Sequence, residues 1–145
     1  MSDHFEKLKN LYLSGPFNAY FDPAVKVEEG CSEVAIAIKP DYFHAAGAAH
    51  GATYFKVLDD AAFLAANSMI EDVIVLTIAF TTNIVRPVSE GQMIARGKLV
   101  NQANRLVLVE ATVHDSNDQL VATASGTFMR SKMRLDSLPG YQLSQ

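Results

Sequence analysis

The feature that most constrains this chain is one long helical pattern with almost no charge, which runs roughly from Ala52 to Ile70. Its apolar residues recur at helical spacing and form one stripe, made of Phe55, Leu58, Ala62, Ala65 and Met69. Small alanines occupy most of the other positions. A helix at a protein surface keeps a charged face, so a helix of this composition is predicted to be buried on most sides. The rest of the chain must then surround it.

Strand patterns make up most of that remainder. Residues 24–39 alternate in period two with a break at Glu29-Gly30, and four more strand patterns follow the helix, at residues 73–85, 93–101, 105–114 and 119–131. These four are joined by short turns, which require antiparallel neighbours because parallel strands need long crossover connections. We therefore predict an α+β fold, in which an antiparallel sheet of about five to six strands wraps around the long helix.

Two of these strands carry more specific expectations. In the strand at residues 73–85, strict alternation predicts two faces, with Ile74, Leu76, Ile78 and Phe80 on one and Thr77, Ala79, Thr81 and Asn83 on the other. In the last strand, a face without bulky side chains is formed by Ala122, Ala124 and Gly126. We expect the helix to approach the sheet closely at that face.

A short helix and a loose tail complete the predicted organisation. Phe5, Leu8, Leu11 and Tyr12 recur at helical spacing and predict an amphipathic helix at about residues 3–13. The tail, at about residues 135–145, is expected to be loosely held. A length of 145 residues favours a single domain over residues 1–145.

Composition argues against several classes of function. Twelve Lys and Arg against sixteen Asp and Glu give a net charge of −4, which argues against a nucleic-acid partner. The single cysteine, Cys31, excludes an intrachain disulfide framework, and the four scattered histidines match no metal-binding signature. The apolar runs are too short to span a membrane, and the N-terminal segment carries charges where a signal peptide is apolar. We expect a soluble, cytoplasmic protein that uses no metal.

Two aspartates inside the apolar helix are candidates for chemistry. Asp60 follows Lys56 by four residues, the spacing of a solvated ion pair. The helical neighbours of Asp59 are mostly apolar, so its carboxylate would be partly desolvated and its pKa raised. Helix position alone is equally compatible with both aspartates lying on one solvated edge. Asp59 is therefore a candidate catalytic carboxylate.

His50 and Gly51 lie where an Ala/Gly segment opens into the helix. The first turn of a helix leaves backbone N–H groups unpaired at the positive end of the dipole, and a glycine lets a ligand oxygen approach them. Such groups can stabilise a carbonyl oxygen that gains negative charge. A turn glycine beside a structural histidine is the simpler interpretation, and the residues alone leave both open.

The segment HGATYFKVLDDAAFLAANS, residues 50–68, resembles the hotdog-fold thioesterase family, particularly the phenylacetate-degradation type and its acyl-CoA thioesterase relatives. In that family a His-Gly-Gly opens the central helix and an aspartate follows nine residues after the histidine, which is the spacing of His50 and Asp59. Ile84-Val85-Arg86-Pro87 also resembles the end of a family strand. The resemblance covers about residues 20–134 and implies a hotdog fold and thioester hydrolysis.

The resemblance also implies roles for single residues. Gly51, beside His50, would supply the N–H that binds the thioester oxygen, and Asp59 would act as general base or nucleophile. Ala52 stands where relatives have a second glycine and would offer a second N–H. Thr77 would help to place water, while His44 stands where relatives often carry an Asn or Gln. The resemblance implies no cofactor other than coenzyme A as part of the substrate.

The spacing of Gly51 and Asp59 predicts an oligomer. Eight residues of helix separate them, which is roughly 12 Å of axis at about 1.5 Å per residue. Reacting atoms must come within about 3–3.5 Å of one another. One chain cannot readily present both groups to one carbonyl, whereas a symmetric dimer can. We therefore expect a homodimer, or a dimer of dimers, with two shared sites.

The expected substrate is an acyl-CoA or a related thioester. Its diphosphate would need cations at the rim of the site, and four are available: Arg86, Arg105, Arg130 and Lys132. Two other functions remain open at this point. One is a non-catalytic module that binds acyl thioesters or regulates in response to them. The other is a hotdog hydratase or dehydratase that acts on enoyl or hydroxyacyl thioesters.

Overall fold

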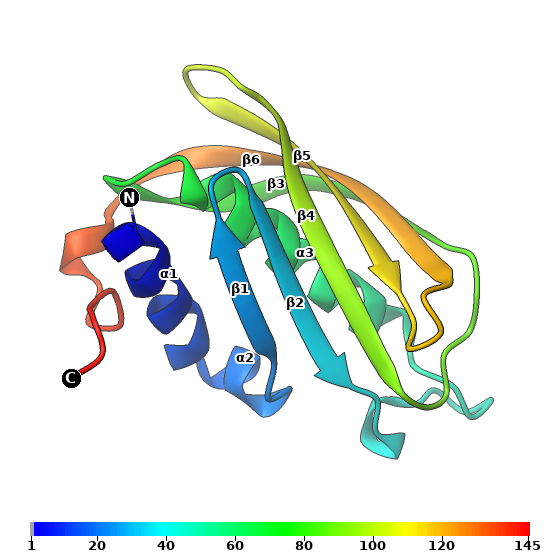
Figure 1. Ribbon diagram of the computed structural model, residues 1–145. Coiled ribbons are helices and arrows are strands. Elements are labelled where there is room, and N and C mark those ends of the chain that lie inside the picture. The colour runs from blue at the N-terminus through cyan, green and yellow to red at the C-terminus, as the bar shows by residue number, and fades with distance from the viewer. Residues whose placement is uncertain (1) are drawn as a thin grey trace.

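The computed structural model describes residues 2–145 (Figure 1). Its elements follow the chain in the order α1 (Ser2–Ser14), α2 (Pro16–Tyr20), β1 (Ala24–Glu28), β2 (Cys31–Ala37), η1 (Pro40–Tyr42), α3 (Gly51–Ser68), β3 (Val73–Ile84), β4 (Gln92–Gln102), β5 (Leu106–His114), β6 (Leu120–Arg134) and η2 (Leu135–Ser137). The elements η1 and η2 are single turns of 3-10 helix.

One antiparallel sheet contains all six strands in the order β1-β2-β4-β5-β6-β3. The sheet curves around α3, and α1 and α2 lie beside the β1 edge (Figure 1). Most side chains of α3 are buried, with Leu58, Ala61, Ala62, Leu64 and Ala65 fully inaccessible to solvent. The predicted α+β fold, a sheet wrapped around one apolar helix, is confirmed. β3 forms the second edge of the sheet.

The closest approach of the helix to the sheet occurs on β4, and not on β6 as expected. A Cβ atom added to Gly97 would overlap the main-chain carbonyl of Ala61 in α3. On β6, Ala122 and Ala124 are buried as predicted, but Gly126 makes room for the ring of Phe80 from the neighbouring strand. The glycine that the helix requires is therefore Gly97.

A β-bulge in β3 changes which side chains face the helix. The pairing of β3 with β6 shifts register between Thr77, which lies opposite Phe128, and Ala79. Beyond the shift Phe80 lies opposite Gly126 and Thr82 opposite Ala124, whose side of β6 is buried. Because directly opposed residues share a face, Thr77 and Phe80 both point toward α3. The strict alternation predicted for this strand is wrong after Thr77.

The two ends of the chain pack against each other. The predicted N-terminal helix is present as α1, whereas α2 was not predicted. Buried His4 donates from Nε2 to the carbonyl of Asn67 at 2.8 Å and accepts at Nδ1 from the Tyr141 hydroxyl at 2.6 Å. Leu135 is fully buried. The tail is therefore docked at least as far as Tyr141, and the expectation that it is loose is wrong.

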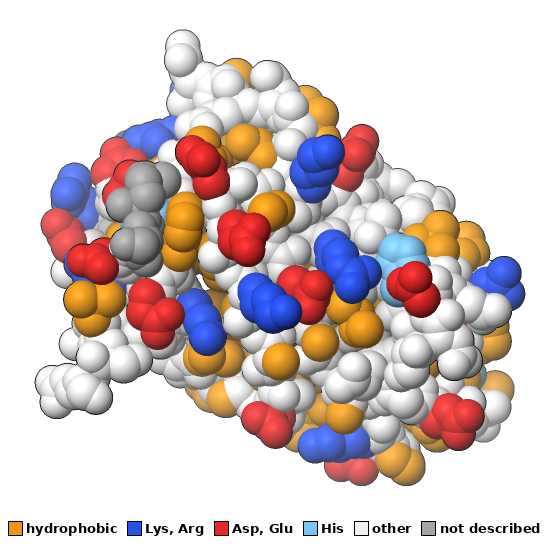
Figure 2. Space-filling model, in the orientation of Figure 1, with side chains coloured by type: hydrophobic (Ala, Val, Ile, Leu, Met, Phe, Trp, Pro, Cys, Tyr) orange, Lys and Arg blue, Asp and Glu red, His pale blue; other side chains and the backbone are white. Residues whose placement is uncertain are grey.

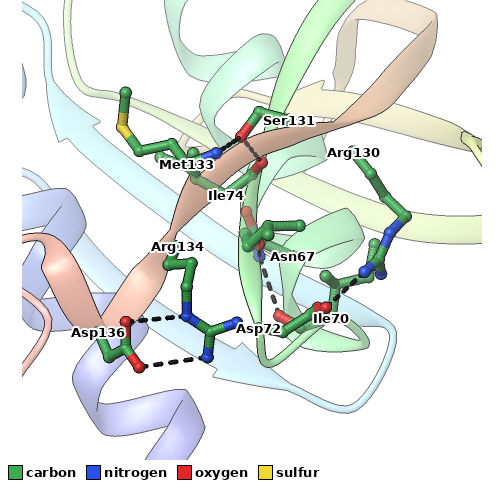
Figure 3. Close-up of polar contacts among 10 residues, drawn as sticks. Asn67, Ile70, Asp72, Ile74, Arg130, Ser131, Met133, Arg134 and Asp136 are labelled. Atoms are coloured by element: carbon green, nitrogen blue, oxygen red, sulfur yellow. Dashed lines mark hydrogen bonds and ion pairs between the residues drawn. The ribbon is translucent and has the colours of Figure 1, made fainter.

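The connection from α3 to β3 is fixed by side-chain hydrogen bonds. Buried Asn67 donates from Nδ2 to the carbonyl of Ile70 at 3.0 Å (Figure 3). It also donates from Nδ2 to the carbonyl of Val73 at 3.1 Å and accepts from the N–H of Val75 at 2.8 Å. This sets the start of the edge strand relative to the helix.

Within residues 2–145, none of the helices combines the length and the apolar character needed to cross a membrane.

The surface carries charges of both signs. Among the described residues on the face shown in Figure 2, acidic and basic side chains are interspersed. On the strands of this sheet Glu33 pairs with Arg96 at 3.1 Å and with Lys26 at 4.0 Å. Charges of opposite sign therefore lie next to one another on β1, β2 and β4.

Candidate active site

The start of α3 leaves one backbone donor free. His50 is the N-cap: its Nδ1 accepts from the N–H of Ala52 at 2.9 Å and its carbonyl accepts from Thr53 at 2.8 Å. The N–H of His50 itself donates to the carbonyl of Tyr42. Of the unpaired donors that a helix start presents, only the N–H of Gly51 has no partner among the described residues. This is the donor that the sequence predicts for the oxyanion.

The same geometry changes the expectation for its two neighbours. The N–H of Ala52 is occupied by His50, so Ala52 does not offer a second free donor in this structure. The exposed imidazole of His50 holds the helix start in place through this cap. A side chain that fixes the first turn also fixes the direction in which Gly51 points its N–H.

A cavity of about 310 Å³ adjoins Gly51. It brings together three of the predicted site residues, His44, Gly51 and Arg86, with Tyr54 and Ile84 among its other walls. The Tyr54 hydroxyl donates to the carbonyl of Arg86 at 2.9 Å, which ties the segment after β3 to the helix. Exposed His44 accepts at Nδ1 from a backbone N–H of its own loop. The residues that line this cavity therefore include Gly51 with its free N–H, the cation Arg86 and the imidazole residue His44.

Asp59 lies two turns further along α3 and is bonded to β3. Its Oδ1 accepts from the Thr77 hydroxyl at 2.8 Å, so the structure joins these two predicted residues directly. Burial raises the pKa of the Asp59 carboxyl above its ordinary value. The Thr77 hydrogen bond opposes this rise, and the neighbouring carboxyl of Asp60 adds to it. The desolvation expected from the apolar neighbours of Asp59 is thus present.

A second cavity, of about 360 Å³, adjoins Asp59 and Thr77. Its other walls come from α1, α2, α3 and the start of β3. Gly51 is not among the residues that line it. Within one chain, the predicted residues therefore form two separate groups, with His44, Gly51 and Arg86 in one and Asp59 and Thr77 in the other.

Asp60 is buried, and the prediction of a solvated pair with Lys56 is wrong. Lys56 Nζ lies 2.5 Å from Asp60 Oδ2, and the two residues are only 9% and 8% exposed. The Tyr12 hydroxyl donates to the same carboxyl at 2.5 Å, and Lys56 also donates to the side-chain carbonyl of Asn18. The Lys56 ammonium lies 5.0 Å from the ring centre of Phe17. This network binds α1 and α2 to α3.

Burial raises the pKa of two groups in this network, Asp60 and Tyr12. It raises the pKa of Asp60, although the Lys56 ammonium and the Tyr12 hydroxyl both favour the charged carboxylate. It also raises the pKa of Tyr12, an effect that the adjacent Asp60 reinforces. The spacing of Lys56 and Asp60 is visible in the sequence, but the contact of Asp60 with Tyr12 is not, because these two residues lie 48 positions apart in the chain.

The four predicted cations do not gather around one cavity of the single chain. Arg86 lines the cavity at Gly51. Arg130 is bonded to Asp72 at 2.6 Å (Figure 3), and its N–H donates to the carbonyl of Arg105. Lys132 is exposed further along β6.

Within residues 2–145, no three His, Cys, Asp or Glu side chains are grouped so as to hold a metal ion.

Comparison with known proteins identifies the family. A family model described as "Thioesterase superfamily" matches residues 46–122, more than half of the chain, including both Gly51 and Asp59. The chain belongs to the thioesterase superfamily. A protein of Archaeoglobus fulgidus named "Putative esterase" is 30% identical over 107 residues, 73% of this chain and 68% of that protein. Family membership supports a hydrolase of the esterase and thioesterase class.

Two solved structures share the fold of this chain. The PaaI protein from the phenylacetic acid degradation operon of E. coli superposes with a TM-score of 0.84 over 92% of this chain and 96% of that one, at 16% identity. A thioesterase family protein of Silicibacter pomeroyi gives 0.80 over 87% and 96%, at 24% identity. With the six-stranded sheet and its long helix, these similarities confirm the predicted hotdog fold.

Proposed function

We propose that this protein hydrolyses acyl-CoA or related thioesters to a free acid and a thiol. The observation that carries the proposal is the free N–H of Gly51 on the same helix as a desolvated Asp59. A binding module has no use for a carboxylate held partly out of water, whereas a general base does. No feature of the site favours the binding module or the hydratase over hydrolysis.

In the proposed reaction the thioester oxygen accepts a hydrogen bond from the Gly51 N–H. Asp59 takes a proton from a water molecule, whose oxygen adds to the carbonyl carbon, and the negative charge moves to the carbonyl oxygen at Gly51. The C–S bond then breaks, the C=O bond re-forms, and the leaving thiolate takes the proton from Asp59, which restores the carboxylate. Thr77, bonded to Asp59 Oδ1, orients that carboxylate so that its other oxygen is free for water.

The proposal requires a homodimer, because two turns of helix separate Gly51 from Asp59. Each site would combine Gly51 of one subunit with Asp59 of the partner subunit. β3 supports this arrangement, since it is a 12-residue edge strand with apolar side chains exposed: Leu76 at 50%, Ile78 at 51% and Ile84 at 46%. Long exposed apolar edges of this kind pair with a second chain. A dimer of dimers would be built from the same unit.

The same pairing bears on the cations. In an antiparallel pair of β3 edges, the Val73 end of one strand lies beside the Ile84 end of the other. Arg86 follows the Ile84 end, whereas Arg105, Arg130 and Lys132 lie near the Val73 end. Two-fold symmetry would bring the two groups toward one site. Arg130 is already paired with Asp72, so we propose Arg86, Arg105 and Lys132 as the diphosphate contacts.

The test is the release of free thiol from a panel of acyl-CoA substrates. The wild-type protein is expected to release thiol from at least one of them, and Asp59→Asn to lower kcat by about 10²-fold or more, the range for lost general-base assistance. The same panel includes crotonyl-CoA, followed by its absorbance. Hydration of crotonyl-CoA without thiol release would replace hydrolysis with the hydratase function, and binding without either reaction would indicate a binding module.

A further inference from the structure

The cavity beside Asp59 is walled by the N-terminal helices, a part of the chain that the reaction above does not use. We propose that this cavity, of about 360 Å³, is the subsite for the acyl group, and that Leu11 of α1 and Phe63 of α3 determine which acyl groups it accepts. The substrate class is then an uncharged, apolar acyl group. This inference rests on the proposed hydrolase function, because it places the acyl group relative to Asp59.

The walls of the cavity are chemically suited to an apolar chain or ring. Leu11 from α1 and Phe63 from α3 supply apolar surface, and Asp59 and Thr77 line the same cavity. Small-molecule sites are commonly apolar with a few placed polar groups, and their volumes start at about 300 Å³. A carbonyl held by Asp59 and its water could therefore direct its acyl substituent into apolar surroundings.

Charge decides between the two halves of the substrate. The carboxyl groups of Asp59 and Asp60 both line the cavity, and the nearest cation, Lys56, is already bonded to Asp60 and Asn18. Coenzyme A carries several negative phosphate charges, which the two carboxyl groups would repel, and no Lys or Arg is among the residues that line this cavity. The cavity at Gly51 has Arg86 in its wall instead. The thiol half is therefore assigned to the Gly51 side and the acyl half to the Asp59 side.

The N-terminal wall is held in a fixed place by the buried network. The Tyr12 hydroxyl donates to Asp60 at 2.5 Å, Lys56 bridges Asp60 and Asn18, and Asn18 Nδ2 donates to the carbonyl of Tyr12 at 2.7 Å. These bonds hold the junction of α1 and α2 against α3. Leu11 is next to Tyr12 in the chain, so the bonds that anchor Tyr12 also locate Leu11. Selectivity needs such a rigid wall, because a mobile one would adapt to any chain length.

The N-terminal wall of the cavity, formed by α1 and α2, lies outside the segment that matches the family model. The superfamily match begins at residue 46, after α1 and α2 have ended, whereas Gly51, Asp59 and Thr77 fall inside it. The matched segment thus carries the reacting groups and Phe63, and the residues before it carry the N-terminal wall with Leu11. A change in α1 can therefore alter the choice of acyl group and leave the reacting groups in place.

The experiment measures binding separately from turnover. The probes are S-alkyl-CoA thioethers of increasing chain length, which have no carbonyl and cannot be hydrolysed, and calorimetry gives their Kd values. Leu11→Ala and Phe63→Leu enlarge the cavity and are expected to improve binding of long chains relative to short ones by about 10-fold or more, the lower range for added methylenes. Leu13→Ala is the matched control, because Leu13 lies in the same helix but does not line the cavity. For Leu13→Ala, the ratio of long-chain to short-chain Kd values should stay within about twofold of the wild-type ratio.

The outcomes distinguish the two proposals. Three outcomes would each overturn the acyl subsite. The first is an unchanged ratio of long-chain to short-chain Kd values in both folded variants. The others are a wild-type Kd that does not depend on chain length, and no binding of any thioether. A thioether that ends in a carboxylate should bind more weakly than its methyl-ended counterpart, and equal binding would contradict the charge argument. Shifted ratios without hydrolysis of the matching thioesters would support the subsite and reject the hydrolase.

Discussion

At the scale of single residues, the N–H of Gly51 can be removed without disturbing the helix. Gly51 is the first residue of α3, where proline is favoured because that N–H has no partner inside the helix. His50 already has the extended backbone that a residue before proline adopts, with φ −61° and ψ 146°. We expect Gly51→Pro to fold and dimerise normally and to lose about 10²–10³ in kcat, the effect of losing one oxyanion donor.

Gly51→Ala is the matched control, because it keeps the N–H. The added Cβ would lie 3.4 Å from Ile84 Cδ1, which is tolerable for a flexible side chain. Its kcat should fall less than tenfold. Equal losses in the alanine and proline variants would show that space at residue 51 matters and that the N–H does not.

The pKa of Asp59 predicts a pH profile and a stability change of defined sign. Burial raises that pKa, so the base should protonate, and kcat fall, at a pH higher than for a free aspartate. The ionised carboxylate also costs folding free energy above this pKa, because the folded state takes up a proton more readily than the unfolded chain. Asp59→Asn should therefore unfold at a higher urea concentration than the wild type near neutral pH. A lower midpoint would contradict the desolvation argument.

At the scale of secondary-structure elements, the buried pair of Lys56 and Asp60 should govern how firmly α1 and α2 are held. Lys56→Met leaves a carboxyl group buried without its cation and should cost about 3–5 kcal/mol of unfolding free energy. Adding Asp60→Leu and Tyr12→Phe removes the buried carboxyl group and the hydroxyl that donates to it, and should regain most of the loss. Lys26→Met at the exposed pair with Glu33 is the control and should cost under about 1 kcal/mol. Urea denaturation measures all three.

The elements also show what the sequence reveals and what it leaves hidden. The continuous apolar pattern of the long helix predicts its ends to within two residues, and the period of each later strand predicts that strand. The sequence does not predict the bulge beside Thr77, because a bulge is a shift in the pairing of two strands and the composition of one strand does not show it. The five-residue α2 is too short to show a period. Gly51 and Asp59 were found through a local motif, whereas the Tyr12–Asp60 contact joins distant segments and has no local signal.

At the scale of the whole molecule, the shared site predicts that two defective variants restore each other. Neither Asp59→Asn nor Gly51→Pro should turn over substrate well as a homodimer. In a mixed dimer, one site combines the intact Gly51 of one subunit with the intact Asp59 of the partner subunit, and the other site carries both lesions. Equal amounts that exchange at random give half mixed dimers, so about a quarter of wild-type activity should return.

The measurement is thiol release after the two variants are co-expressed or are unfolded and refolded together. Mixing two preparations of the same variant is the control and should restore nothing. Light scattering on the same samples should give at least a dimer, because the apolar β3 edge is the proposed interface. Activity that stays at the level of the separate variants would place Gly51 and Asp59 of one chain in the same site. The two turns of helix between them would then have to be spanned within a single subunit, for which the two cavities of the chain provide no common space.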